Sequence, residues 1–112
     1  MNPGHGLTKK LVARLNGVLS RFPEVERAVL FGSRAKGTYR PGSDIDLALG
    51  GRELDWRIIG KIYDELDDLL LPYRFSLINF DRSTDPEVAA HIARVGIPLF
   101  QRERSNGALV KK

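Results

Sequence analysis

The stretch VLFGSRAKGTYRPGSDIDLAL, residues 29–49, decides the fold of this chain. It starts as an apolar run, breaks at a Gly-Ser pair, crosses a basic, turn-rich loop and returns as an Asp-Ile-Asp triplet that leads into more apolar residues. Residues two apart on a strand point to the same side, so Asp44 and Asp46 should project together with their roots roughly 7 Å apart. Carboxylates this close repel each other unless a cation lies between them. The pair therefore predicts a site for a divalent cation.

Outward from this stretch, helical and strand patterns alternate. Apolar residues at three-and-four spacing predict helices, and short runs rich in branched or aromatic residues predict strands. In chain order we expect a helix within 7–22, a strand at 25–31, a helix start at 33–35, a strand at 45–49, a helix from Asp55 that stops at Pro72, a strand at 74–80, a helix from Asp85 to Gly96 and an edge strand at 97–100. This order predicts an α/β (α+β) fold, a small mixed β-sheet with helices packed on it.

Some burial expectations follow from the same patterns. The buried stripe of the helix after Asp55 is expected to comprise Ile58, Ile59, Ile62, Leu66, Leu69 and Leu70. The aromatic residues Trp56, Tyr63 and Tyr73 are expected to be partial core rather than stacking platforms. His91 lies on a helix that also carries apolar residues, so we expect a surface or boundary position rather than a catalytic one.

Length and composition limit the possibilities further. The 112 residues suffice for one domain, expected at residues 7–101, with flexible polar tails at 1–6 and 102–112. The chain has no cysteine, which excludes disulfides and thiolate metal sites, and its two histidines do not suggest zinc. No apolar run approaches the ~20 residues of a membrane span, so we expect a soluble, cytoplasmic protein.

The formal net charge of +4 favours an anionic partner. Nucleic acid is the weaker interpretation, because several of the positive charges lie in the tail at 102–112 and in the loop after Ser33. Phosphate contact by that loop explains part of the excess. Arg34 and Lys36 are the first candidates, because they lie nearest the Gly-Ser pair.

Gly32-Ser33, ten further residues and then Asp44-x-Asp46 resembles the signature of the polymerase-beta-like nucleotidyltransferases. The small size makes the chain most similar to the minimal nucleotidyltransferases (MNT), which sit beside helical HEPN-domain proteins in prokaryotic toxin-antitoxin pairs. The resemblance implies that Gly32 and Ser33 hold the triphosphate of ATP or another nucleotide. It implies that Asp44 and Asp46 are the catalytic ligands of Mg²⁺, with up to two ions, and that a HEPN-type protein is the partner.

Each half of this signature also has an ordinary structural interpretation. Gly32-Ser33 alone could be a strand-to-loop turn, and Asp44 with Asp46 a solvated strand end. Together, at the family spacing and each at the end of a predicted strand, they favour a nucleotide site. A lone motif of either kind would not.

One position departs from the family pattern. The family carries a third carboxylate in a segment resembling Pro-Tyr-x-x-Asp-Leu, and residues 72–77 of this chain, PYRFSL, place Ser76 there. Asp81 lies five residues further, some 16 Å along a strand and on its opposite face. Two hypotheses follow: an antitoxin that transfers AMP from ATP to a hydroxyl of its HEPN-type partner, or a nucleotide-binding module, weakened in catalysis, that neutralises the partner by contact. Nucleic-acid binding without chemistry fits the charge and little else.

Overall fold

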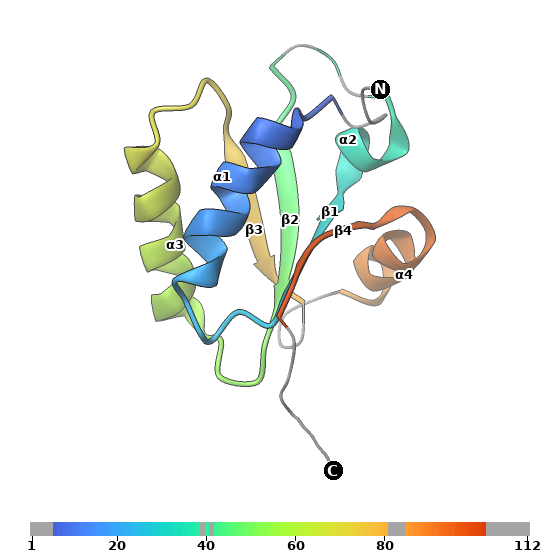
Figure 1. Ribbon diagram of the computed structural model, residues 1–112. Helices are drawn as coiled ribbons and strands as arrows, with labels where there is room; N and C mark the ends of the chain where they lie inside the picture. Colours follow the sequence, from blue (N-terminus) through green and yellow to red (C-terminus); the bar gives the residue numbers. More distant parts are fainter. Residues whose placement is uncertain (1–5, 39, 41, 81–84, 103–112) are drawn as a thin grey trace.

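Helices and strands alternate along the whole described chain (Figure 1), which comprises residues 6–38, 40, 42–80 and 85–102 of a computed structural model. The elements are α1 (Lys9–Ser20), β1 (Arg27–Phe31), α2 (Gly32–Lys36), β2 (Ile45–Gly50), α3 (Trp56–Asp68), β3 (Phe75–Asn79), α4 (Pro86–Val95) and β4 (Ile97–Gln101). The predicted order of elements is confirmed, with bounds that differ by a few residues.

The four strands form one mixed sheet in the order β3-β2-β1-β4. β1 runs antiparallel to both of its neighbours, β2 and β4, whereas β2 and β3 are parallel and are connected through α3. A parallel pair needs such a crossover, which explains why a helix stands between these two strands in the sequence. The predicted edge position of the last strand is confirmed.

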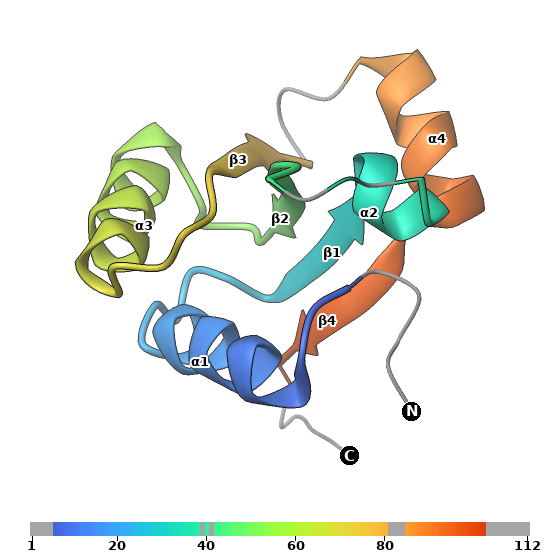
Figure 2. The same ribbon diagram turned by 90° about the horizontal axis from the view of Figure 1, so that it is seen from above.

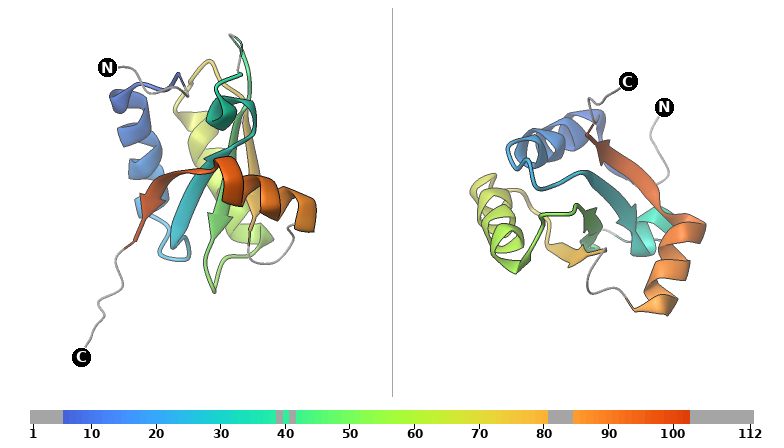
Figure 3. Two further views of the ribbon diagram at one scale, coloured as in Figure 1. Left: turned by 90° about the vertical axis from the view of Figure 1, so that its right-hand side faces the viewer. Right: turned by 90° about the horizontal axis from the view of Figure 1, so that it is seen from below.

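Helices cover the two faces of the sheet unequally. α1 and α3 lie side by side on one face, whereas α2 and α4 gather at the β1 side of the other face (Figure 2). Figure 3 shows the sheet standing between α1 and α4. Ile45, Leu47 and Leu49 belong to the core cluster beneath α1 and α3. Side chains alternate along a strand, so Asp46 lies on the opposite face from that cluster.

Side-chain caps begin the longer helices. The Asp55 carboxylate accepts hydrogen bonds from the backbone N–H groups of Arg57 and Ile58, as expected for an N-cap. Asp85 caps α4 in the same way, with Pro86 in the first turn, and Gly96 ends that helix. Thr8, which the sequence patterns did not single out, caps α1.

The end of α3 differs from the expected one. The helix stops at Asp68, well before Pro72, and Leu70 adopts a left-handed backbone with φ 56°. Leu70 is 88% exposed, so its assignment to the buried stripe was wrong: the helical spacing no longer applies beyond the last turn. Trp56 is also exposed, contrary to expectation, whereas Tyr63 and Tyr73 do pack against the core.

Arg102 is anchored, although we expected the flexible tail to begin at this residue. Its backbone N–H donates to Glu26 at 2.8 Å, which extends the pairing of β4 with the segment before β1. Its guanidinium donates to four backbone carbonyl oxygens, those of Leu19, Ser20, Phe22 and Val25, at 3.0–3.5 Å. Two of these carbonyls close α1, so Arg102 joins the last strand to the end of the first helix.

No helix within the described residues is long and apolar enough to cross a membrane.

Candidate functional site

Asp46 lies in the middle of three adjacent strands. Its Cα is paired with Phe31 of β1 on one side and with Ser76 of β3 on the other. Asp44 lies just before β2 and is exposed. Ser76 therefore lies beside Asp46 and on the same face of the sheet, because residues paired across a sheet point to the same face.

The turn from β1 into α2 brings a glycine against the Asp46 carboxylate. Gly32 has φ 75°, a left-handed conformation that disfavours residues with a side chain. A Cβ on Gly32 would overlap Asp46 Oδ2. The glycine of the Gly-Ser pair and the second aspartate of the triplet thus form one structural unit, although 13 residues separate them in the sequence.

The surroundings of Asp46 disfavour the ionised form of its carboxyl group. Burial of the side chain is the largest cause that raises its pKa, and the neighbouring Asp44 charge raises the pKa further. A positive charge on His91, where the ring is protonated, would oppose these two effects and lower the pKa. A cation bound between Asp44 and Asp46 would favour the ionised form. The two carboxylates have the oxygen chemistry that Mg²⁺ requires, with the remaining positions left for phosphate oxygens and water.

Arg34 is buried, with only 3% of its surface exposed. Its guanidinium donates from Nε and from one terminal nitrogen to the Ser43 carbonyl, at 3.3 and 3.2 Å, and lies 5.3 Å from the centre of the Tyr73 ring. These contacts tie α2 to the segment that leads into Asp44. Lys36 is exposed at the end of α2 and Ser33 is half-buried at its start, so phosphate contact by any of the three stays a prediction.

The third carboxylate of the family pattern has no replacement nearby among the described residues. Within them, no three His, Cys, Asp or Glu side chains form a group that could hold a metal ion. Asp81 lies outside the described residues. The site as described offers Asp44 and Asp46 as cation ligands and Ser76 as a neutral neighbour of the second one.

His91 contacts the site, which the sequence patterns did not reveal. Its half-buried boundary position on α4 is confirmed, but its Nε2 also accepts a hydrogen bond of 3.2 Å from the Gly32 backbone N–H. The imidazole meets Phe31 edge-on, with ring centroids 6.3 Å apart. A partner 59 residues away leaves no local signal; only the histidine itself, a polar residue on an apolar helix face, could have pointed to it.

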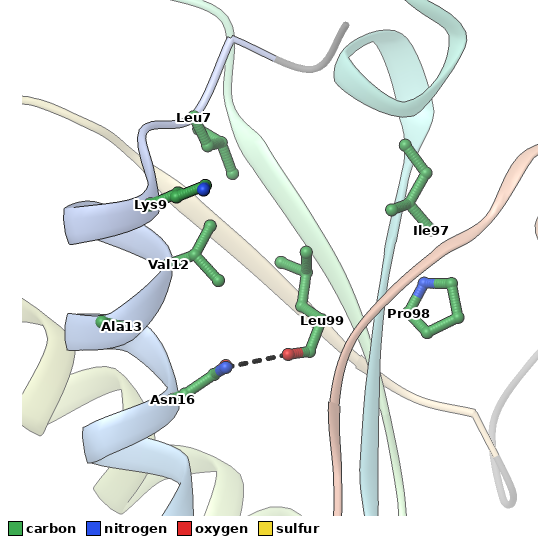
Figure 4. A pocket seen from close by; sticks show the side chains of 8 residues that line it. All are labelled: Leu7, Lys9, Val12, Ala13, Asn16, Ile97, Pro98 and Leu99. Carbon is green, nitrogen blue, oxygen red and sulfur yellow. Dashed lines mark hydrogen bonds between the residues drawn. The ribbon is translucent and has the colours of Figure 1, made fainter. Parts of the chain in front are cut away.

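A separate pocket of about 390 Å³ lies on the α1 face of the sheet (Figure 4). It is lined mostly by apolar side chains of α1 and β4, and Asn16 donates across it to the Leu99 carbonyl at 2.9 Å. Asp46 faces the opposite side of the sheet. None of the described residues that line this pocket is a carboxylate, so among them it does not extend the cation site.

Similar proteins share this architecture. No curated protein matches the chain. Among solved structures, a toxin-antitoxin complex with AMP-PNP has a TM-score of 0.68 at 23% identity, covering 83% of this chain and 75% of that one. A second, the toxin-antitoxin MntA-HepT, has a TM-score of 0.61 at 20% identity, with 81% and 70% covered. The third contains a tri-AMPylated Shewanella oneidensis HEPN toxin with its MNT antitoxin and has the same TM-score, identity and coverage.

The sequence itself assigns the family. The family model described as "Polymerase beta, Nucleotidyltransferase" matches residues 13–105, which include the Gly-Ser pair, both aspartates and Ser76. The chain therefore belongs to the polymerase-beta nucleotidyltransferase family and has the fold of its minimal members, the MNT antitoxins.

Proposed function

We propose that this protein is an MNT-type antitoxin that binds ATP with Mg²⁺ and transfers AMP to a hydroxyl group of a HEPN-type partner protein. The observation that carries the proposal is the arrangement around Asp46, whose carboxylate lies against the Gly32 backbone and beside Asp44. A purely structural strand has no need for a half-buried carboxylate next to a second one. We propose the cytosol as the setting, where ATP and Mg²⁺ are both present.

The reaction forms a phosphorus–oxygen bond to the partner and breaks the one that links the α-phosphate to pyrophosphate. The partner's hydroxyl oxygen attacks the α-phosphorus of ATP, pyrophosphate leaves, and the hydroxyl proton passes to solvent or a base. Bound Mg²⁺ would neutralise the negative charge that accumulates on the phosphates. Asp44 and Asp46 would hold the cation, and Ser33 would bind the terminal phosphates where Gly32 lets the backbone come close. Arg34 and Lys36 would supply positive charge beside them.

Ser76 limits this activity. A carboxylate at this position could hold a second cation or take the proton of the attacking hydroxyl, and a neutral hydroxyl does neither well. Its place beside Asp46 supports a slow transferase. The same observation favours the second candidate function, a nucleotide-binding module that neutralises its partner by contact alone.

The choice of partner and nucleotide is supported by the similar structures. They include a complex with AMP-PNP and one in which a HEPN toxin carries AMP groups beside its MNT antitoxin. Those observations belong to the proteins concerned. For this chain they define which partner and which nucleotide should be tested first.

The test combines the protein, ATP labelled at the α-phosphate, Mg²⁺ and the product of the neighbouring gene as the candidate partner. Label on the partner, lost in EDTA and in the Asp44→Asn, Asp46→Asn double variant, supports AMP transfer. A stable complex without label supports neutralisation by contact. Salt-sensitive nucleic-acid binding with no partner complex would overturn both proposals.

A further inference from the structure

The hydrogen bond from the Gly32 N–H to His91 Nε2 occurs where the regular pairing of β1 has ended. The register of β1 with β2 stops at Phe31 and Asp46, and Gly32 already begins α2. The backbone N–H of Gly32 thus lies beyond the strand ladder and in the first turn of a helix, where no intrahelical acceptor exists. A half-buried N–H in this position needs a side-chain partner, and His91 supplies it.

The bond also fixes the state of the imidazole. Nε2 can accept a hydrogen bond only when it carries no proton, so the ring must be neutral with its proton on Nδ1. Phe31 meets the same ring edge-on and limits its rotation. The orientation of His91 is therefore set by the two residues that precede Ser33.

α4 packs closely against β1, and this packing fixes the position of His91 relative to Gly32. At the end of the helix, a Cβ on Gly96 would lie 2.6 Å from Val29 Cγ1, so α4 approaches β1 more closely than a side chain there would permit. Val29 belongs to the same strand that ends at Gly32. α4 thus contacts β1 at two places, through Gly96 beside Val29 and through His91 at the strand end.

We propose that His91 is a positioning residue of the nucleotide site. Its neutral imidazole holds the Gly32 peptide against the Asp46 carboxylate and so fixes the place where Ser33 enters α2, before any nucleotide binds. Preorganisation of this kind improves affinity because the turn need not be ordered during binding. The inference rests on the proposed nucleotide binding, and it adds a residue that lies outside the Gly-Ser and Asp-x-Asp signature.

Two variants separate the hydrogen bond from the packing. His91→Gln keeps an acceptor that can reach the Gly32 N–H but loses the aromatic ring, whereas His91→Phe keeps a ring against Phe31 but has no acceptor. We expect calorimetry with ATP and Mg²⁺ to show a Kd about five- to tenfold higher for His91→Phe, the size expected for one lost hydrogen bond, and nearly unchanged for His91→Gln. The reverse order, or no change in either variant, would overturn the proposal.

A second measurement does not depend on nucleotide binding. In ¹⁵N NMR of the wild-type protein, we expect His91 to be the tautomer with an unprotonated Nε2, and we expect the Gly32 amide resonance to move far more in His91→Phe than in His91→Gln. A proton on Nε2 of the neutral ring would overturn the positioning role even if His91→Phe failed to fold. If wild-type protein shows the bond but binds no ATP, the proposed function fails and the hydrogen bond stands.

Discussion

Asp46 is a side chain whose charge disfavours the folded state. Burial and the Asp44 charge raise its folded pKa above the usual 3.8, so the ionised form is less favourable in the folded than in the unfolded protein. The penalty is absent at pH values below the unfolded pKa, grows as the pH rises through the folded pKa, and is complete near neutrality. We therefore expect Asp46→Asn to raise the Tm of the metal-free protein at pH 7, measured in EDTA.

The control for this prediction is Asp64→Asn on the exposed face of α3. It should leave the Tm nearly unchanged, and the advantage of Asp46→Asn should disappear towards pH 3. Saturating Mg²⁺ with ATP should reverse the order, because only the wild type then gains binding energy. A lower Tm for Asp46→Asn in EDTA would mean that the carboxylate stabilises the fold itself.

Substitutions at Gly32 and at a control glycine distinguish two costs of a side chain: backbone strain at positive φ, and steric overlap with the Asp46 carboxylate. Gly32→Ala combines a positive φ with a Cβ that would overlap the Asp46 carboxylate, and we expect a loss of roughly 1–3 kcal/mol in stability together with loss of ATP binding. Gly42 is the matched control. It has φ 87° but open space where a Cβ would lie, so Gly42→Ala should show the backbone cost alone when both are compared by urea denaturation.

Ser76 can be tested by restoring the carboxylate. Ser76→Asp should increase AMP transfer by about 10²- to 10⁴-fold, the usual contribution of one proton-transfer group, and should require more Mg²⁺ if the new acid binds a second ion. Ser76→Ala should transfer at the wild-type rate. A wild-type rate that the Asp variant cannot exceed would show that another residue already supplies this role.

At the scale of single residues, the sequence identified those site residues that lie close together along the chain. The Gly-Ser pair and the two aspartates belong to adjacent strand ends, and their spacing identified the family that the chain belongs to. His91 and the buried contacts of Arg34 were not predicted. Both depend on a partner across the fold, which neither periodicity nor motif spacing encodes.

Among the elements, α3 and the turn that follows it each contain one residue of an unfavourable type for its backbone conformation. Gly60 lies in the helix interior with nothing within 4 Å of a Cβ, and Leu70 takes the left-handed position after the helix end, where glycine is preferred. We expect Gly60→Ala and Leu70→Gly each to stabilise the isolated protein by about 1 kcal/mol, and to do so additively because Gly60 lies within the helix and Leu70 beyond its end. Thermal or urea unfolding measures this.

A matched control for these two changes is Gly17→Ala in α1. This glycine is also helical with open space around it, so the substitution should give a similar gain. If Leu70→Gly instead weakens a complex with the partner while stabilising the free chain, the exposed leucine belongs to an interface.

The helix periods were predicted correctly because amphipathic spacing is regular, whereas the end of α3 depends on one left-handed residue that no spacing reveals.

For the molecule as a whole, Arg102 joins the end of β4 to the end of α1. Its side chain satisfies four carbonyl oxygens between Leu19 and Val25, so we expect Arg102→Ala to cost roughly 2–3 kcal/mol, the range for a hydrogen-bonded charged group. Two truncations provide the comparison in thermal unfolding. A chain ending after residue 102 should keep the full-length Tm, and one ending after Gln101 should lose what Arg102→Ala loses.

The fold could be predicted at this scale because helices and strands alternate and a family signature lies between two of the strands. The sheet order and the anchoring of Arg102 could not, because both depend on pairing between distant segments. β1 occupies a central place between β2 and β4, although β4 follows it by more than 60 residues in the chain.

The same two features determine how the protein can fold while it is being synthesised. The ribosome makes α1 and β1 early, but β1 obtains its second neighbour only after β4 (Ile97–Gln101) has been added, and α1 the side-chain donor for its last carbonyls only after Arg102. Until then one edge of β1 stays unpaired, and unpaired strand edges invite aggregation and chaperone binding. A message cut short before the codons for β4 should therefore yield a polypeptide that is degraded, rather than a shorter protein with part of the activity.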